Sequence, residues 1–147
     1  MPNKIRGNVY KRAVRLALLY GSECWPMRRT DEQKIHLTEM KMRLWRGGVS
    51  RKDKMRNDYI RGSFKVATVH EKFRENRLRW YGHVMRRYDD HMSKRVMNIE
   101  EGKKGHGRPP ITWLQTLKND LKTTNISKRV THNHTMWRKI TRSSDHN

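Results

Sequence analysis

The sequence predicts an all-α protein: a small, loosely packed helical domain with a flexible basic linker and a C-terminal helical segment. Three observations predict it. Apolar residues recur at helical spacing, no stretch alternates convincingly as a strand would, and only 33% of the 147 residues are hydrophobic. Globular domains usually hold about 45 to 50% of such residues. We therefore expect a small core built from scattered aromatic, methionine and leucine side chains.

The N-terminal part of the chain predicts two helices. The first covers about residues 9–20 and ends at Gly21, a residue typical of helix ends. Its apolar positions are Val9, Ala13, Leu16, Ala17 and Tyr20. The second begins at Thr30, which stands three residues before Gln33 as in a capping box, and ends at Gly47. Its apolar positions are Leu37, Met40, Met42, Leu44 and Trp45.

The middle of the chain predicts a short helix over residues 51–61 and a long one from about Val69 to Arg87. The short helix has little apolar content and is expected to lie on the surface of its neighbours. The long helix is both amphipathic and cationic, since arginines occupy the positions outside one apolar stripe. That stripe consists of Val69, Phe73, Trp80, Tyr81, Val84 and Met85.

The C-terminal part begins after a stretch rich in Lys, Gly, His and Pro. Residues 89–110 predict a basic linker, with a hinge over residues 102–110. Two helical stripes follow it, made of Leu114, Leu117 and Leu121 and then of Met136, Trp137 and Ile140. We therefore expect a helical region over residues 1–88, the linker over 89–110 and a C-terminal helical segment over 111–147.

The charge of the chain points to a polyanionic partner. Lys and Arg number 35 against 14 Asp and Glu, which gives a formal net charge of +21 and a pI near 10.9. RNA and DNA are the expected partners, bound through their phosphates, and a membrane is not. Basic residues beside the apolar stripe and in the linker are the candidate contacts. They are Arg74, Arg77, Arg79, Arg86, Arg87, Lys103, Lys104 and Arg108.

The aromatic residues of the long helix allow two interpretations. Trp80 and Tyr81 could stack on unpaired bases, since aromatic rings beside guanidinium groups hold single strands without sequence readout. Alternatively the rings form the core. Because aliphatic residues are so few, the sequence favours the core interpretation. It is favoured for Trp45, Phe73, Trp80 and Trp113.

Residues with catalytic or metal-binding chemistry form no convincing set. Cys24 is the single cysteine, which excludes an internal disulfide, favours an intracellular location in nucleus or cytoplasm, and is interpreted as a small buried side chain. The acidic pair in the run Tyr88-Asp89-Asp90 is interpreted as the turn after a helix. His132 and His134 lack further ligands at a usual spacing. We expect no catalytic residue, no metal and no cofactor.

Several strings, in order along the chain, resemble the region downstream of the polymerase core in endonuclease-reverse transcriptases of non-long-terminal-repeat retrotransposons. The most recognisable is the run from Arg77 to Arg87, Arg-Leu-Arg-Trp-Tyr-Gly-His-Val-Met-Arg-Arg. The others are residues 18–25, 39–42, 57–63 and 107–110, then Trp113, Asp120-Leu121, Trp137-Arg138 and Asp145. The resemblance covers nearly the whole chain from about Leu18 onward.

The resemblance implies a nucleic-acid-binding piece of an RNA-directed DNA polymerase that lacks the endonuclease and the metal-binding aspartates. Residues 42–48 depart from the family pattern, with Arg43 and Leu44 exchanged and Arg46 in place of an apolar residue. Two alternatives stay open. The stripe from Val69 to Arg87 could dock on the polymerase body of the same element, or the chain could be the product of a decayed copy.

Overall fold

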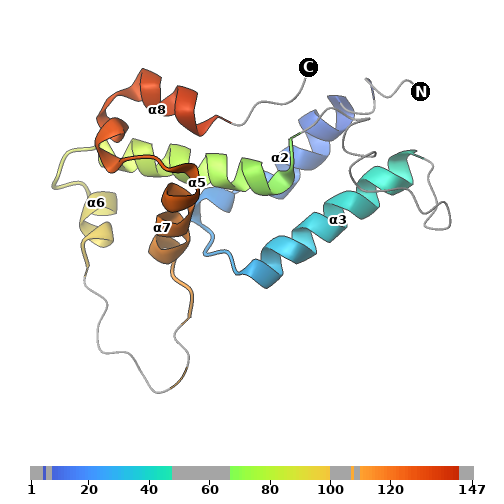
Figure 1. Cartoon of the computed structure of the whole chain (residues 1–147), viewed down its shortest axis with the longest axis horizontal. Helices are drawn as coiled ribbons and strands as arrows, with labels where there is room; N and C mark the ends of the chain where they lie inside the picture. Colours follow the sequence, from blue (N-terminus) through green and yellow to red (C-terminus); the bar gives the residue numbers. More distant parts are fainter. Residues whose placement is uncertain (1–4, 6–7, 48–66, 100–106, 108–109, 143–147) are drawn as a thin grey trace. The chain divides into compact units, whose positions relative to one another are not determined.

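The computed structural model describes residues 5, 8–47, 67–99, 107 and 110–142, with the side chains of residues 45–47 left out (Figure 1). No β-strand occurs in these ranges, which confirms the predicted all-α class. The elements in chain order are η1 (Tyr10–Val14), α2 (Arg15–Leu19), η2 (Ser22–Cys24), α3 (Arg29–Gly47), α5 (Val69–Met85), α6 (Met92–Met97), α7 (Trp113–Thr124), η4 (Lys128–His132) and α8 (His134–Thr141).

The chain forms two compact units, and the boundary between them falls within α5. The first unit comprises residues 1–22, 28–73 and 143–147, and the second comprises residues 23–27 and 74–142. The first unit therefore holds η1, α2, α3 and the first turn of α5. The second holds the rest of α5 and all the helices that follow it.

The first helix of the sequence is observed, but its buried side is not the predicted apolar stripe. It starts as the π-helical turn η1, continues as α2, and stops before Gly21, whose φ of 68° favours glycine. Leu16 and Tyr20 are 63% and 85% exposed. The buried residues are instead Tyr10 and Arg15. The stripe was wrong because partners distant in sequence decide which side of this helix is covered.

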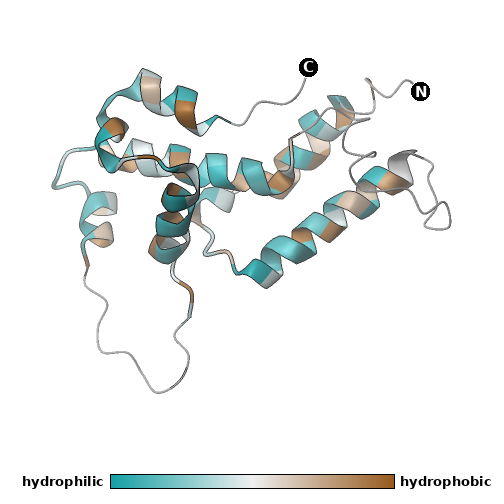
Figure 2. Ribbon diagram, in the orientation of Figure 1, coloured by the Kyte–Doolittle hydropathy of each residue, from teal (hydrophilic) through white to brown (hydrophobic). Residues whose placement is uncertain are grey.

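Helix α3 begins at Arg29, so its cap lies two residues before the predicted cap, Thr30. Arg28 occupies the cap position, and its backbone N–H donates to Asp31 Oδ2 over 3.4 Å. That contact is the acidic half of a capping box, shifted by two residues from the predicted pair of Thr30 and Gln33. Hydrophilic residues dominate the helix, which is mostly teal in Figure 2 with isolated hydrophobic positions. Burial must therefore include polar groups.

A buried carboxylate, Glu39, organises the first unit. It is wholly buried, and its Oε1 accepts from the Tyr10 hydroxyl and, over 2.6 Å, from Arg43 Nη2. Its Oε2 accepts from the backbone N–H of Val69 over 3.3 Å. Arg15 and Arg43 also donate to the Ala67 carbonyl, over 3.1 and 3.4 Å, and both guanidinium groups lie over the Tyr10 ring.

The Glu39 network bears on the exchange of Arg43 and Leu44 relative to the retrotransposon proteins that the sequence resembles. Arg43 stands where Leu would be expected, yet its side chain is only 3% exposed. A buried guanidinium is tolerated when a carboxylate is within hydrogen-bonding distance. Glu39, one helical turn earlier, supplies that carboxylate. Glu39 and the Ala67 carbonyl thus satisfy Nη2 of Arg43, while its buried Nε and Nη1 have no hydrogen-bond partner among the described residues. Arg46 lies outside the described side chains.

The core of the second unit is a small apolar cluster joining α5, α7 and α8. Its buried members are Leu78, Tyr81, Leu117, Leu121 and Trp137. Met85, Met97, Trp113, Ile126 and Val130 are partly buried around it. The leucine stripe predicted for α7 is therefore confirmed for Leu117 and Leu121, whereas Leu114 is only partly buried. In α8 the stripe reduces to Trp137, since Met136 and Ile140 are 50% and 41% exposed.

Gly82 allows α8 to approach α5 closely. A Cβ atom at this glycine would lie 2.2 Å from Nε1 of Trp137, so only a residue without a side chain fits there. The indole N–H donates to the Leu78 carbonyl over 3.0 Å. The Tyr81 and Trp137 rings lie 6.1 Å apart, centroid to centroid. The largest aromatic side chain of the core is thus fixed by shape and by one directional bond.

Helix α7 has specific residues at both ends. Thr112 is its N-cap, with a hydroxyl that accepts from the backbone N–H of Gln115 over 3.3 Å. Asn125 ends it in the left-handed conformation, with φ of 52°, and the N–H of Ile126 donates back to the Leu121 carbonyl over 3.2 Å. This is the Schellman pattern. The caps at Thr112 and Asn125 thus define where α7 begins and ends.

The predicted linker is not uniform. Its first part contains the short helix α6 (Met92–Met97), capped by the His91 side chain, which accepts from the Ser93 N–H. Residues 100–106 and 108–109, which include most of the predicted hinge, lie outside the described residues. So does the short helix predicted over residues 51–61.

Cys24 requires a further correction, and the burial of the α5 stripe bears on its predicted docking role. Cys24 is exposed, so its interpretation as a buried side chain is wrong, whereas Ser22 in the same turn η2 is wholly buried. The α5 stripe was proposed as a docking face, yet Tyr81 and Val84 are only 4% and 1% exposed. Most of that stripe is covered by the chain itself, Trp80 at 37% exposed being the exception, and docking on a polymerase body stays a prediction.

Candidate nucleic-acid interface

Helix α5 divides its second-unit residues between a buried face and an exposed face. Arg77, Leu78, Tyr81 and Val84 are turned inward. The exposed face is defined by positions three and four apart, a spacing that brings side chains together on a helix. These residues are Asn76, Arg79, Trp80, His83 and, just after the helix, Arg86 and Arg87.

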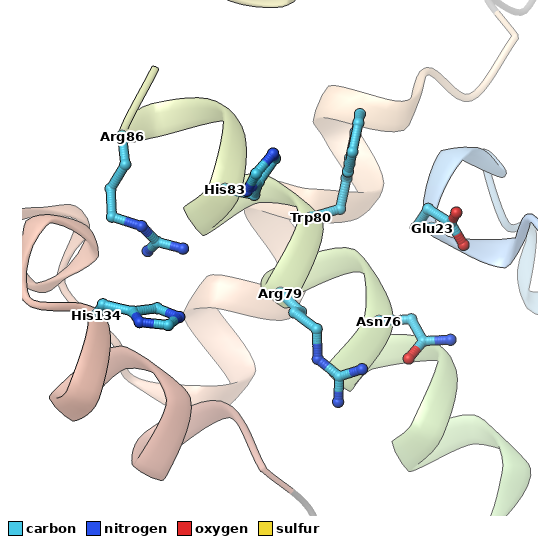
Figure 3. A pocket seen from close by; sticks show the side chains of 7 residues that line it. All are labelled: Glu23, Asn76, Arg79, Trp80, His83, Arg86 and His134. Carbon is cyan, nitrogen blue, oxygen red and sulfur yellow. The ribbon is translucent and has the colours of Figure 1, made fainter.

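A hollow of about 510 Å³ lies on this exposed face (Figure 3). We call it the α5 pocket. It is lined by Glu23, Asn76, Arg79, Trp80, His83, Arg86 and His134. Five of these come from α5 and the turn that follows it, His134 comes from the start of α8, and Glu23 from η2. All seven residues belong to the second unit.

Hydrogen bonds orient the cationic groups of the α5 pocket. Arg79 Nη2 donates to Glu75 Oε1 over 2.5 Å, while 66% of the Arg79 side chain stays exposed. Arg86 Nη1 donates to the Thr131 carbonyl over 2.9 Å, which ties this side chain to η4. Each guanidinium carries five N–H donors, so one bond leaves others available for an anion. The arrangement suits phosphate binding.

The aromatic part of the α5 pocket is a stacked pair. The Trp80 and His83 rings lie 5.7 Å apart with an angle of 27° between their planes. Trp80 is 37% exposed, so the interpretation of this residue as core is wrong. Tyr81 and Phe73 are buried and Trp113 is partly buried, as predicted; the Trp45 side chain lies outside the described residues. Phe73 and Trp113 therefore follow the core interpretation, whereas stacking of Trp80 on an unpaired base stays a prediction.

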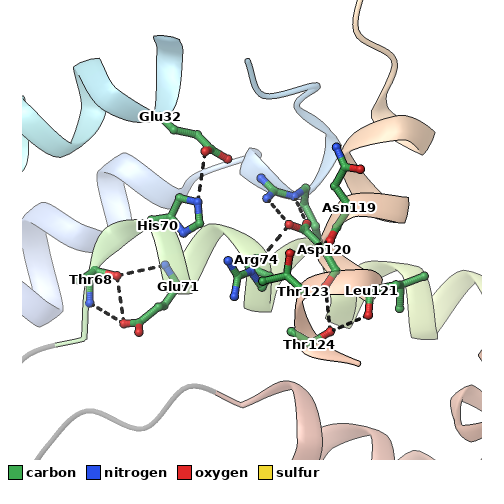
Figure 4. A network of polar contacts seen from close by, with 11 residues as sticks. Glu32, Thr68, His70, Glu71, Arg74, Asn119, Asp120, Leu121, Thr123 and Thr124 are labelled. Carbon is green, nitrogen blue, oxygen red and sulfur yellow. Dashed lines mark hydrogen bonds and ion pairs between the residues drawn. The ribbon is translucent and has the colours of Figure 1, made fainter. Parts of the chain in front are cut away.

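Arg74 and Arg77 are placed differently from the other predicted cations. Arg77 is wholly buried, and its guanidinium donates to both carboxylate oxygens of Asp120, over 2.6 and 3.1 Å. Arg74 lies near the same carboxylate, at 3.7 Å, with 24% of its side chain exposed (Figure 4). In this fold Arg77 offers no surface donor, and we leave it out of the interface.

The remaining predicted cations are partly described. Arg87 is exposed and its Nη2 lies 2.9 Å from His83 Nε2, which places it beside the stacked pair. Lys103, Lys104 and Arg108 lie outside the described residues. The structure therefore brings together Arg79, Arg86 and Arg87 from the predicted set.

The acidic run after α5 forms a turn, as predicted. Tyr88 and the two aspartates follow the end of the helix, and Lys94 Nζ donates to Asp89 Oδ1 over 2.5 Å. The hydrogen bond and the charge of Lys94 lower the pKa of the Asp89 carboxyl. Among the described residues, no three His, Cys, Asp or Glu side chains gather closely enough to hold a metal ion. No helix in the described ranges is long and apolar enough to cross a membrane.

Four residues of the α5 pocket were missed by sequence reasoning. Asn76 and His83 could have been found from their helical spacing to Arg79 and Trp80. Glu23 and His134 could not be found in this way. Each lies in another element, more than 50 residues from Arg79 and Trp80 along the chain. Only the tertiary fold brings them to this face.

Comparison with known proteins gives one informative similarity. The chain is 26% identical over 133 residues to an uncharacterized transposon-derived protein of Caenorhabditis elegans. The match covers 86% of this chain and 48% of the relative, so the chain spans about half the length of that protein. Models of known protein families give no match. Solved structures give no match either. The similarity supports an origin in a transposable element.

Proposed function

We propose that this chain is a non-catalytic C-terminal part of a retrotransposon reverse transcriptase and that it binds RNA or DNA mainly through phosphates. The observation that carries the proposal is the convergence of Arg79, Arg86 and Arg87 on the exposed face of α5. The similarity to a transposon-derived protein and the resemblance of the run from Arg77 to Arg87 support the same origin.

Charge and geometry support phosphate contact over a general solubilising role. A formal charge of +21 repels itself in a compact state, and a polyanion relieves that repulsion. Arg79 and Arg86 are each oriented by one hydrogen bond and keep further donors. Binding an anion there requires little additional ordering of the side chains.

The test is a fluorescence-anisotropy titration of the full chain with single-stranded RNA and with duplex DNA at several salt concentrations. Each phosphate contact on a duplex should lower the logarithm of affinity by about 0.9 per decade of salt, and by somewhat less on a single strand. Binding that does not respond to salt, or no binding at all, would overturn the proposal.

A set of three substitutions locates the interface. Arg79→Gln, Arg86→Gln and Arg87→Gln together should reduce the salt slope by roughly two to three contacts. The matched control replaces three exposed arginines from other elements, Arg95, Arg129 and Arg138, by Gln. It removes the same charge. Equal losses in the two sets would mean that net charge, and not this face, binds the nucleic acid.

A further inference from the structure

Trp80 is an aromatic residue whose exposure the core does not explain. In the same unit Trp137 is 1% exposed and Trp113 packs against the core cluster, whereas Trp80 is 37% exposed and lines a pocket. An exposed indole face can stack on a planar ring, a contact that every nucleobase can make. His83 stacks near Trp80, which stabilises the orientation of the indole.

The charges of the α5 pocket are unevenly distributed. In Figure 3 the Glu23 carboxylate lies on one side of Trp80, while Arg86 and His134 lie on the other side. A phosphate is attracted to the guanidinium groups and repelled by the carboxylate. A base can instead be accepted near Glu23, because a carboxylate accepts from amino groups. The Glu23 carboxylate and the Arg86 guanidinium thus lie on opposite sides of the indole.

We propose that the α5 pocket binds one unpaired nucleotide of a single-stranded nucleic acid, with its base stacked on Trp80 and its phosphate held by Arg79 and Arg86. This inference rests on the proposed nucleic-acid binding and specifies its substrate class. A volume of about 510 Å³ lies within the range of roughly 300 to 1,000 Å³ that is usual for small-molecule sites. A duplex does not satisfy the pocket, since its bases are stacked on one another and are not free to turn toward Trp80.

The experiment compares three ligands with the full chain: a single-stranded oligonucleotide, the same strand with abasic positions, and a duplex. The abasic strand keeps every phosphate and removes only the bases. Wild-type protein should bind it roughly five- to a hundred-fold more weakly than the intact strand, the range expected for losing one base-aromatic stack. Equal affinity for the two strands would overturn the inference without any substitution in the protein.

Substitutions at Trp80 then test whether this residue is the one on which the base stacks. Trp80→Leu should weaken single-strand binding by a similar factor and change duplex binding less than about two-fold, whereas Trp80→Phe should keep most of the affinity. For the abasic strand, Trp80→Leu should make little difference. The matched control is Trp25→Leu, since Trp25 is 42% exposed in the same unit but does not line the pocket.

The outcomes separate this inference from the proposed function. If Trp80→Leu lowers single-strand and duplex affinity equally, or changes neither, the pocket is not a base site, although salt-sensitive binding through phosphates still stands. If the wild-type chain binds neither ligand, both proposals fail. Circular dichroism of each variant verifies that its helices are retained.

Discussion

Arg77 and Asp120 form a bidentate ion pair that is buried inside the second unit. The Arg77 side chain is wholly buried, and its Nε and Nη2 donate to the two carboxylate oxygens over 2.6 and 3.1 Å. The pair joins α5 to α7 beside the apolar cluster that contains Leu78, Leu117 and Leu121. In so small a core, a charged contact of this kind helps to fix which turn of one helix meets the other.

Removing one partner of this pair should destabilise the second unit strongly. Asp120→Ala leaves a buried guanidinium without its carboxylate, and we expect a loss of about 3 to 5 kcal/mol in the free energy of unfolding. The double substitution Arg77→Met/Asp120→Leu should recover most of it, because no wholly buried guanidinium is then left without its carboxylate. Urea unfolding followed by circular dichroism measures both. Asp90→Ala, which removes an exposed carboxylate, should change stability by less than about 0.5 kcal/mol.

The close approach of Trp137 to Gly82 predicts a substitution whose effect changes sign with its background. Gly82→Ala places a methyl group 2.2 Å from Nε1 of the indole, and we expect a loss of about 1 to 3 kcal/mol or more. In a Trp137→Leu background the ring is gone, and the same change should be neutral or stabilising by up to about 1 kcal/mol, since alanine favours helix over glycine. Thermal unfolding of the four proteins tests this. Equal losses in both backgrounds would mean that the indole is not the obstacle.

The helices of this chain could be predicted because their signals are local. Leu117 and Leu121 are four residues apart, and both are buried on one side of α7. Gly21 ends the first helix as expected. The prediction of which side of a helix is buried failed where that side contains polar residues. Arg15 is buried because Ala67, 52 residues away, accepts its hydrogen bond, and hydrophobic periodicity carries no information about such partners.

Only part of the candidate interface could be predicted, because its placement also depends on residues distant in sequence. Arg79, Arg86 and Arg87 were identified from charge, yet Arg77, in the same cationic run, is withdrawn by Asp120 from a later helix. Trp80 was expected in the core because the chain is poor in aliphatic residues. Leu78, which the apolar stripe omitted, occupies that place, and the indole is left on the exposed face.

Thr112 should contribute to stability as the N-cap of α7. Its hydroxyl satisfies the backbone N–H of Gln115, one of the donors that the first turn of a helix leaves unpaired. Thr112→Ala should therefore cost about 1 kcal/mol. Thr123→Ala in the last turn is the matched control, because the Thr123 hydroxyl bonds the Asn119 carbonyl within the helix. That change should be neutral or slightly stabilising. Urea midpoints that shift equally for both variants would contradict a capping role.

The buried Tyr10 hydroxyl predicts that the first unit loses stability at alkaline pH. Burial is the main cause that raises the pKa of Tyr10 above its ordinary value, and the hydrogen bond to Glu39 and the charge of Glu39 add to it. A tyrosine in the unfolded chain ionises near pH 10, whereas Tyr10 in the folded chain keeps its proton to higher pH. The Tyr10 contribution is therefore complete below about pH 10 and decreases as the pH rises above it. Burial raises the pKa of Tyr81 in the same direction, so the second unit should follow the same trend.

Comparison of two tyrosine variants isolates the Tyr10 contribution. Unfolding free energies measured from about pH 9 to pH 11 should fall with pH in the wild-type chain, with a slope that includes up to about one proton released by Tyr10 on unfolding. Tyr10→Phe removes that proton and should flatten the slope, even though the loss of the Glu39 hydrogen bond lowers stability at every pH. Tyr88→Phe, at a residue that is 88% exposed, should leave the slope unchanged. Parallel slopes for the wild type and Tyr10→Phe would show that the Tyr10 proton is held no more tightly in the folded chain than in the unfolded one.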